Sequence, residues 1–161
     1  MSNLDNPYYE RIAAPIWLRL LGLLLLALAI LTAVLAILNS GVIFAYASSA
    51  IGVTIGFIVL TSCAYISVVS AIVIKVESNT LIVEFNPVWR RRIALSDIAS
   101  AGLEHIGWSS FGGLGLRFTA HNQALLFSSG TAVFVRPLSH GAILHVRTER
   151  PNELLAALGK S

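Results

Sequence analysis

The segment with the most suggestive spacing for chemistry is glycine-rich and reads Gly112-Gly113-Leu114-Gly115. A phosphate-binding P-loop needs Lys and then Ser or Thr after its last glycine, with a strand before it and a helix after it. Here Arg117 comes two residues after Gly115, and a strand-like segment follows instead of a helix. We therefore interpret these glycines as a tight turn with a close backbone approach, and we expect no cofactor.

The histidines and the cysteine do not form a metal-binding pattern. No pair of histidines has the spacing of metal ligands on a helix, and the single cysteine, Cys63, lies in an apolar segment far from them. We expect no metal site, and we expect surface or strand-face positions for the four histidines: His105, His121, His140 and His145.

The sequence also lacks the residue patterns of a hydrolase. A serine hydrolase places its nucleophile on an elbow such as Gly-x-Ser-x-Gly, which this sequence does not contain. Asp97 lies in a segment typical of a turn between strands, and Glu77 and Glu84 flank a hairpin without forming a paired-carboxylate site. We expect no catalytic residues and no small-molecule substrate, and therefore not an enzyme.

The sharpest charge feature is Arg90-Arg91-Arg92. On a strand, alternation puts Arg90 and Arg92 on one face and Arg91 on the other. The functional interpretation is contact of Arg90 and Arg92 with anionic lipid head groups; the alternative is a solvated strand face. Nucleic-acid binding is not expected, because no recognition motif is present and Trp89 is the only aromatic residue close to these arginines.

The elements that must position these residues begin with a long uncharged segment. From Leu20 to Ile74, 55 residues contain no Asp, Glu, Lys, Arg or His, and 56% of the whole chain is hydrophobic. A single helix of that length would measure about 80 Å, whereas about 20 residues cross the bilayer core. Asn39-Ser40-Gly41 is the natural break. The segment therefore predicts two membrane helices, at about 17–38 and 43–66, after a leader at 1–16; the end of the second helix is not fixed.

Charge predicts the orientation of these helices. Arg11 precedes the first helix and Arg19 lies at its start, Lys75 follows the second helix, and the connection between the helices carries no Lys or Arg. Short loops with Lys and Arg stay in the cytoplasm. We expect an inner-membrane protein with two spans and cytoplasmic N- and C-termini.

Within the helices, the spacing of Gly52 and Gly56 permits a close approach of another helix. We favour packing within the chain, against Ala29, Ala33 and Ala36 of the first helix, over packing against a second copy. A channel or transporter is disfavoured because the apolar run from Leu20 to Ile74 contains no ionisable residue.

After the helices the hydrophobic period becomes two. The segment 72–76, the turn Ser78-Asn79-Thr80 and the segment 81–85 predict a hairpin. Further strands are predicted at 88–95, 98–106, 116–119, 124–127, 132–135 and 143–147, and a helix at 151–158 after Pro151. The expected fold is a membrane α-helical hairpin followed at 70–161 by an all-β barrel or antiparallel sandwich with one C-terminal helix.

Three short motifs in this tail carry a family resemblance: Ile93-Ala94-Leu95-Ser96-Asp97-Ile98, Gly112-Gly113-Leu114-Gly115-Leu116-Arg117, and the closing segment from Thr148 to Leu158. They resemble those of a bacterial pleckstrin-homology-like (PH-like) domain. The chain as a whole is similar to small two-helix actinobacterial membrane proteins of unknown function. The resemblance implies a binding or assembly module and supplies no catalytic residues.

We therefore expect a non-catalytic membrane protein that presents a PH-like module at the cytoplasmic membrane surface. The expected partners are membrane lipid and another membrane protein or a second copy of the chain. The residues expected to contact a partner are Trp108, Phe111, Gly112, Gly113 and Gly115. The alternative is a small transporter or channel subunit with a regulatory cytoplasmic tail.

Overall fold

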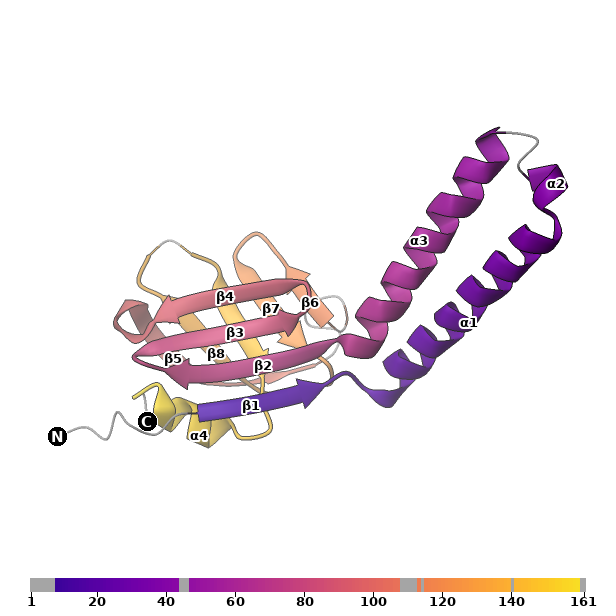
Figure 1. Ribbon diagram of the computed structural model, residues 1–161. Coiled ribbons are helices and arrows are strands. Elements are labelled where there is room, and N and C mark those ends of the chain that lie inside the picture. Colours follow the sequence, from indigo (N-terminus) through magenta and orange to yellow (C-terminus); the bar gives the residue numbers. More distant parts are fainter. Residues whose placement is uncertain (1–7, 44–46, 108–112, 114, 140, 160–161) are drawn as a thin grey trace. The chain divides into compact units, whose positions relative to one another are not determined.

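The structure is a computed structural model, which describes residues 8–43, 47–107, 113, 115–139 and 141–159 (Figure 1). The chain forms two compact units. The helical unit comprises Ala14–Ser70, and the β unit combines Met1–Ala13 with Ala71–Ser161.

The helical unit contains two long helices, α1 at Ile16–Leu38 and α3 at Ala47–Val69, with the short helix α2 at Ser40–Ile43 between them. Both long helices are long and apolar enough to cross a membrane, with mean hydropathies of 3.0 and 2.0. The prediction of two such helices is confirmed. Asn39 ends α1, and α3 continues three residues past the predicted position 66.

Small residues line the contact between α1 and α3. Gly22 and Ala29 of α1 are buried, and so is Ala64 of α3. A Cβ built at Gly22 would lie 2.8 Å from Cγ2 of Val68 and 3.0 Å from the Ala64 carbonyl oxygen. Small residues at such a contact let two helix backbones approach closely. Gly22 is therefore the glycine that this helix pair requires.

The predicted packing role of Gly52 and Gly56 within the chain is wrong. Among the described residues, nothing lies within 4 Å of a Cβ built at either position. Their backbones therefore do not approach α1 closely. The expected helix face formed by Ala29, Ala33 and Ala36 is nevertheless buried or half-buried.

The first sheet of the β unit has the strand order β1-β2-β3-β4, with every pair antiparallel. Its strands are β1 at Tyr8–Ala13, β2 at Ala71–Glu77, β3 at Thr80–Asn86 and β4 at Trp89–Ala94. β1 precedes the helices and pairs with β2, which follows them, from Tyr8 opposite Val76 to Ala13 opposite Ala71. The helical unit is thus inserted between two neighbouring strands.

The β2–β3 hairpin confirms the prediction for that segment. Ser78 and Asn79 have φ angles of 47° and 65°. Two consecutive residues with positive φ suit the two-residue turn that matches the twist of antiparallel strands. Asn tolerates this conformation better than most residues do.

The second sheet has the order β5-β8-β9-β7-β6. The 3₁₀ turn η1 at Leu95–Asp97 leads into strands β5 at Ile98–Ile106, β6 at Gly115–Phe118, β7 at Asn122–Leu126, β8 at Gly130–Pro137 and β9 at Ile143–Arg147. The expectation of a purely antiparallel arrangement is wrong for one pair. β9 lies between β8 and β7, antiparallel to β8 and parallel to β7.

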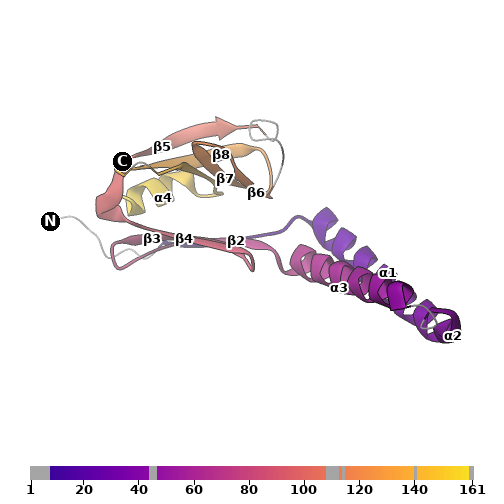
Figure 2. The same ribbon diagram turned by 90° about the horizontal axis from the view of Figure 1, so that it is seen from above.

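The two sheets form layers with α4, at Pro151–Ala157, between them (Figure 2). Leu154 and Leu158 of this C-terminal segment are buried, and α4 contacts β8, β5 and β1. Gly159 follows with φ of 66°, a conformation that favours glycine at the end of a helix. Both sheets contribute fully buried side chains to the core: Ile72, Ile74, Leu81, Val83, Leu125, Leu126, Val133, Val135, Leu144 and Val146.

Candidate functional site

Four cations lie on the face of the first sheet that points away from the core. Ile72 and Ile74 of β2 are buried, so alternation turns Lys75 to the opposite face. In register with Lys75 lie Tyr9 on β1, Ile82 on β3 and Arg92 on β4. The row two residues closer to the Ala13–Ala71 pair contains Arg11, Val73, Glu84 and Arg90. We call Arg11, Lys75, Arg90 and Arg92 the basic face.

The cations of the basic face differ in their partners. Arg90 Nε lies 2.9 Å from Glu84 Oε1, so this arginine is already partly neutralised. Lys75 Nζ lies 5.4 Å from the centre of the Tyr9 ring. Arg11, Lys75 and Arg92 form no ion pair with the described part of the chain. Three positive charges are therefore available to an anion from solution or from a membrane.

The sequence predicts Arg90 and Arg92 on one face. It does not predict that Arg11 and Lys75 lie on the same face. The alternation of β2 contained the signal for Lys75, because Lys75 is the charged residue between buried Ile74 and buried Val76. Arg11 joins the face only through the pairing of β1 with β2, which crosses the whole helical unit. Nothing local in the sequence indicates that pairing.

Arg91 points inward, as the predicted alternation requires. Its Nη1 donates hydrogen bonds to Gln123 Oε1 of β7 at 2.6 Å and to the Ala142 carbonyl oxygen at 3.1 Å. Burial lowers the pKa of Arg91 below its ordinary value. Arg91 thus joins the two sheets and is not part of the exposed basic face.

The structure describes only part of the glycine-rich segment. Trp108, Phe111 and Gly112 fall outside the described residues. Gly113 and Gly115 have φ angles of 125° and 95°, which strongly favour glycine. A Cβ at Gly113 would lie 2.9 Å from a terminal guanidinium nitrogen of Arg117, so the backbone passes close to that side chain.

A buried polar cluster joins the N-terminal strand to the chain just before α4. The Glu10 carboxylate accepts hydrogen bonds from Tyr8 Oη at 2.6 Å, from the Thr148 hydroxyl, and from the Glu149 backbone N–H at 2.8 Å. Burial raises the pKa of the Tyr8 phenol, and its hydrogen bond to Glu10 raises it further, so the hydroxyl stays protonated. Arg150 also donates to the Tyr9 carbonyl oxygen at 2.6 Å. These contacts hold β1 in place.

His145 on β9 is buried, which the sequence did not indicate. Its Nδ1 lies 3.0 Å from Glu104 Oε2, and its Nε2 lies 3.1 Å from Asn122 Oδ1. Burial lowers the pKa of His145 from its ordinary value of 6.5, and the nearby Glu104 carboxylate partly offsets this effect. No described nucleophile or carboxylate pair accompanies it in the manner of a catalytic site.

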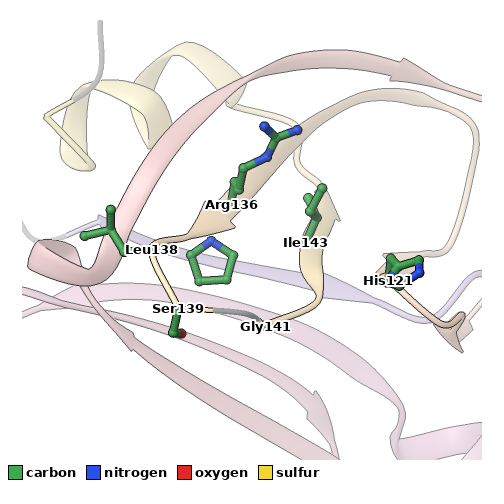
Figure 3. A pocket seen from close by; sticks show the side chains of 7 residues that line it. His121, Arg136, Leu138, Ser139, Gly141 and Ile143 are labelled. Atoms are coloured by element: carbon green, nitrogen blue, oxygen red, sulfur yellow. The ribbon is translucent and has the colours of Figure 1, made fainter.

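A shallow depression of about 310 Å³ lies beside the β8–β9 connection. Figure 3 shows its lining side chains pointing in different directions, with Arg136 and Ser139 on opposite sides. Ligand sites bring a few polar groups together on one point, and this depression does not. We assign it no ligand.

No protein-family model matches the chain, and searches of curated proteins and of solved structures found no match.

Proposed function

We propose that this is a non-catalytic inner-membrane protein that crosses the bilayer twice, keeps both termini in the cytoplasm and holds a PH-like module against the lipid surface. The basic face of the module contacts anionic lipid head groups. The observation that carries the proposal is the pairing of β1 with β2 on either side of the helical unit.

This pairing supports the two-span topology. β1 and β2 are neighbours in one sheet, so both must lie in the same compartment. Two apolar helices lie between them in the sequence. If the chain enters the membrane through α1, it must return through α3 for β1 to reach β2. Arg11, Arg19 and Lys75 at these ends favour the cytoplasm for that shared compartment.

Labelling of single cysteines tests the topology. In a Cys63→Ala background, a cysteine at Ser40 in the short helix α2 should react with a membrane-impermeant maleimide added to intact spheroplasts. A cysteine at Tyr9, which is 54% exposed on β1, should react only after lysis. Labelling of Tyr9→Cys before lysis would contradict cytoplasmic termini.

The architecture of the β unit supports its PH-like assignment. A four-stranded antiparallel sheet faces a second sheet, and a C-terminal helix lies between them. Strands in sequence followed by one terminal helix are also what the motif resemblance implies. The parallel β7–β9 pair distinguishes this chain from a simple meander of antiparallel strands.

The position of the basic face supports lipid contact. Only Ala14 and Pro15 separate β1 from α1, and only Ser70 separates α3 from β2. The strands that carry Arg11 and Lys75 are therefore tethered directly to the membrane helices. Each cation near an anionic surface contributes roughly 1 kcal/mol. Arg11, Lys75 and Arg92, which form no ion pair with the described residues, provide most of this attraction, because Arg90 already contacts Glu84.

The test compares lipids retained by the full-length protein. Each protein is placed in nanodiscs of mixed neutral and anionic lipid and then released from them in the mass spectrometer. Native mass spectrometry counts the lipids that stay bound to it. Replacing Arg11, Lys75 and Arg92 with Ala should lower anionic-lipid retention by about one to two orders of magnitude, and added salt should have a similar effect. Arg136→Ala removes an exposed cation from the second sheet and should change little. Equal retention by the triple variant would refute the lipid contact.

We also propose that the module captures a membrane partner through the segment of the sequence that contains Trp108, Phe111 and Gly112. Pull-down of the full-length protein from native membranes in mild detergent, followed by mass spectrometry, should recover a stoichiometric partner. Replacing Trp108 and Phe111 with Ala should reduce its recovery while the thermal unfolding midpoint stays unchanged. A protein that is recovered alone would contradict this part of the proposal.

A further inference from the structure

We infer that one end of the β unit dips into the membrane interface through an apolar edge formed by Val88, Trp89 and Phe118. This inference rests on the proposed two-span topology and adds a second, apolar contact to the basic face. Val88 and Phe118 are each 58% exposed, a costly state in water for side chains of this size. Both belong to the same end of the β unit.

Strand register places the apolar edge beside the strand ends that lead into the helices. Ala13, Ala71 and Asn86 are directly paired across β1, β2 and β3, and Asn86 begins the turn that carries Val88. Neighbouring strands lie about 4.8 Å apart, so this turn lies roughly 10 Å from Ala13 across the sheet. Figure 1 shows the β3–β4 turn at the end of the first sheet where β2 begins. Ser70 alone connects β2 to α3.

The edge is held together by contacts between the two sheets. The Trp89 and Phe118 rings meet edge to face with their centres 6.3 Å apart. The Val88 N–H donates to the Phe85 carbonyl oxygen at 2.8 Å, which holds the turn closed. Val88 is thereby presented at the tip, with Trp89 and Phe118 beside it.

The chemistry of this edge fits the interface of a bilayer. Tryptophan concentrates at the boundary between lipid tails and head groups, and arginine reaches from there to phosphates. Arg90 follows Trp89 directly, and Arg11 lies in the same row as Arg90. A membrane-spanning chain places a bilayer within reach of these side chains, so the occupant that we assign to the edge is lipid.

The test uses nitroxide labels on the full-length protein in liposomes of mixed neutral and anionic lipid. In the Cys63→Ala background, single labels are placed at Val88, at Phe118 and at two references. Leu138 is the matched reference, because its side chain is 66% exposed. Its backbone N–H donates to the Asp97 carbonyl oxygen, which places it at the opposite end of the first sheet from Val88. Leu28, 47% exposed on α1, reports the membrane interior.

Collisions with oxygen, which concentrates in lipid, are compared with collisions with a water-soluble nickel chelate. We expect oxygen to dominate at Leu28, Val88 and Phe118, and the chelate to dominate at Leu138. If Leu28 is in lipid while Val88 and Phe118 match Leu138, the inference fails and the two-span proposal stands. If Leu28 itself is in water, both fail.

A second measurement avoids changes at the edge. Trp17 and Trp108 are replaced with Phe, which leaves Trp89 as the only fluorophore of the three tryptophans. Lipids brominated near the head group should quench Trp89 by at least about twofold relative to unlabelled lipids. Absence of quenching in a protein with an unchanged unfolding midpoint would overturn the inference.

Discussion

Glu10 shows how one buried carboxylate joins distant parts of the chain. It is 6% exposed, and its two oxygens accept bonds from Tyr8 on its own strand and from Thr148 and Glu149 before α4. A buried charge is tolerated only when it is hydrogen-bonded. The arrangement satisfies that condition with two partners that lie near the other end of the chain.

Removing this carboxylate should destabilise the β unit. Glu10→Ala removes the acceptor of the Glu149 N–H and leaves the Tyr8 and Thr148 hydroxyls to bond only to each other within the cluster. We expect a loss of about 2–4 kcal/mol in the free energy of unfolding. Glu77→Ala, at an exposed position at the end of β2, should cost less than about 0.5 kcal/mol. Thermal unfolding of both full-length variants in detergent measures the difference. Equal midpoints would show that the cluster contributes nothing.

Burial of His145 predicts a pH dependence of stability. Its pKa in the folded chain lies below the ordinary 6.5, so the unfolded chain binds the proton more readily. The free energy of unfolding therefore has its full value above pH 6.5. It decreases as the pH falls from there through the lower pKa of His145 in the folded chain. His145→Gln should flatten the decline of the unfolding midpoint in this window. His105→Gln, at an exposed position on β5, should leave the slope as it is in the parent protein.

At the scale of elements, the helix pair depends on where glycine lies along the contact. A Cβ at Gly22 meets Val68 and the backbone of Ala64, whereas a Cβ at Gly52 meets open space within the described chain. Both positions are interior to a helix, so the gain in helix propensity from Ala is about the same for each. Comparing alanine substitutions at Gly22 and Gly52 therefore isolates the effect of the close approach between α1 and α3.

We expect Gly22→Ala to destabilise the helical unit by about 1–3 kcal/mol, the usual cost of overpacking, and Gly52→Ala to have no such cost. Unfolding of the full-length variants, followed by helical circular dichroism in detergent, measures both. A loss at Gly52 accompanied by a change in oligomeric state would instead assign Gly52 and Gly56 to contact with a second copy. Equal stability of the two variants would contradict the observed packing.

Most elements follow from local pattern. The uncharged run predicts both long helices, and alternation with turn residues predicts strands β2 to β9 and the helix after Pro151 to within a few residues. β1 escapes prediction because its inward positions include Tyr8 and Glu10, so its buried side does not read as apolar. The place of Arg11 on the basic face could not be predicted for the same reason, since Arg11 reaches that face only through the pairing of β1 with β2. The order of the second sheet is also beyond local pattern, because β9 lies between two strands that precede it in the sequence.

At the scale of the whole molecule, the two units are separable at one point. Ala13 and Ala71 lie opposite each other as the last pair of β1 and β2. Opposite residues in antiparallel strands have Cα atoms about 5 Å apart. A two-residue turn spans that gap. Residues 14–70 are therefore not needed to connect β1 to β2.

We expect a chain in which residues 14–70 are replaced by Asn-Gly to fold as a water-soluble β protein. Its far-ultraviolet circular dichroism should show strand structure and a cooperative thermal transition, because the core of the β unit lies outside the removed segment. A matched chain with the same junction and Glu10→Ala should melt at a lower temperature. A soluble aggregate without a cooperative transition would contradict the independence of the β unit.

The insertion of the helical unit between β1 and β2 also has a consequence for biogenesis. The ribosome releases β1 early, but its neighbour β2 emerges only after both apolar helices have been synthesised. In the proposed two-span topology, a chain in which one helix failed to insert would keep β1 and β2 in different compartments, and β2 would then expose an unpaired strand edge of the kind that favours aggregation. In that topology, closure of the first sheet would require that both helices are inserted, because β1 and β2 must lie in one compartment to pair.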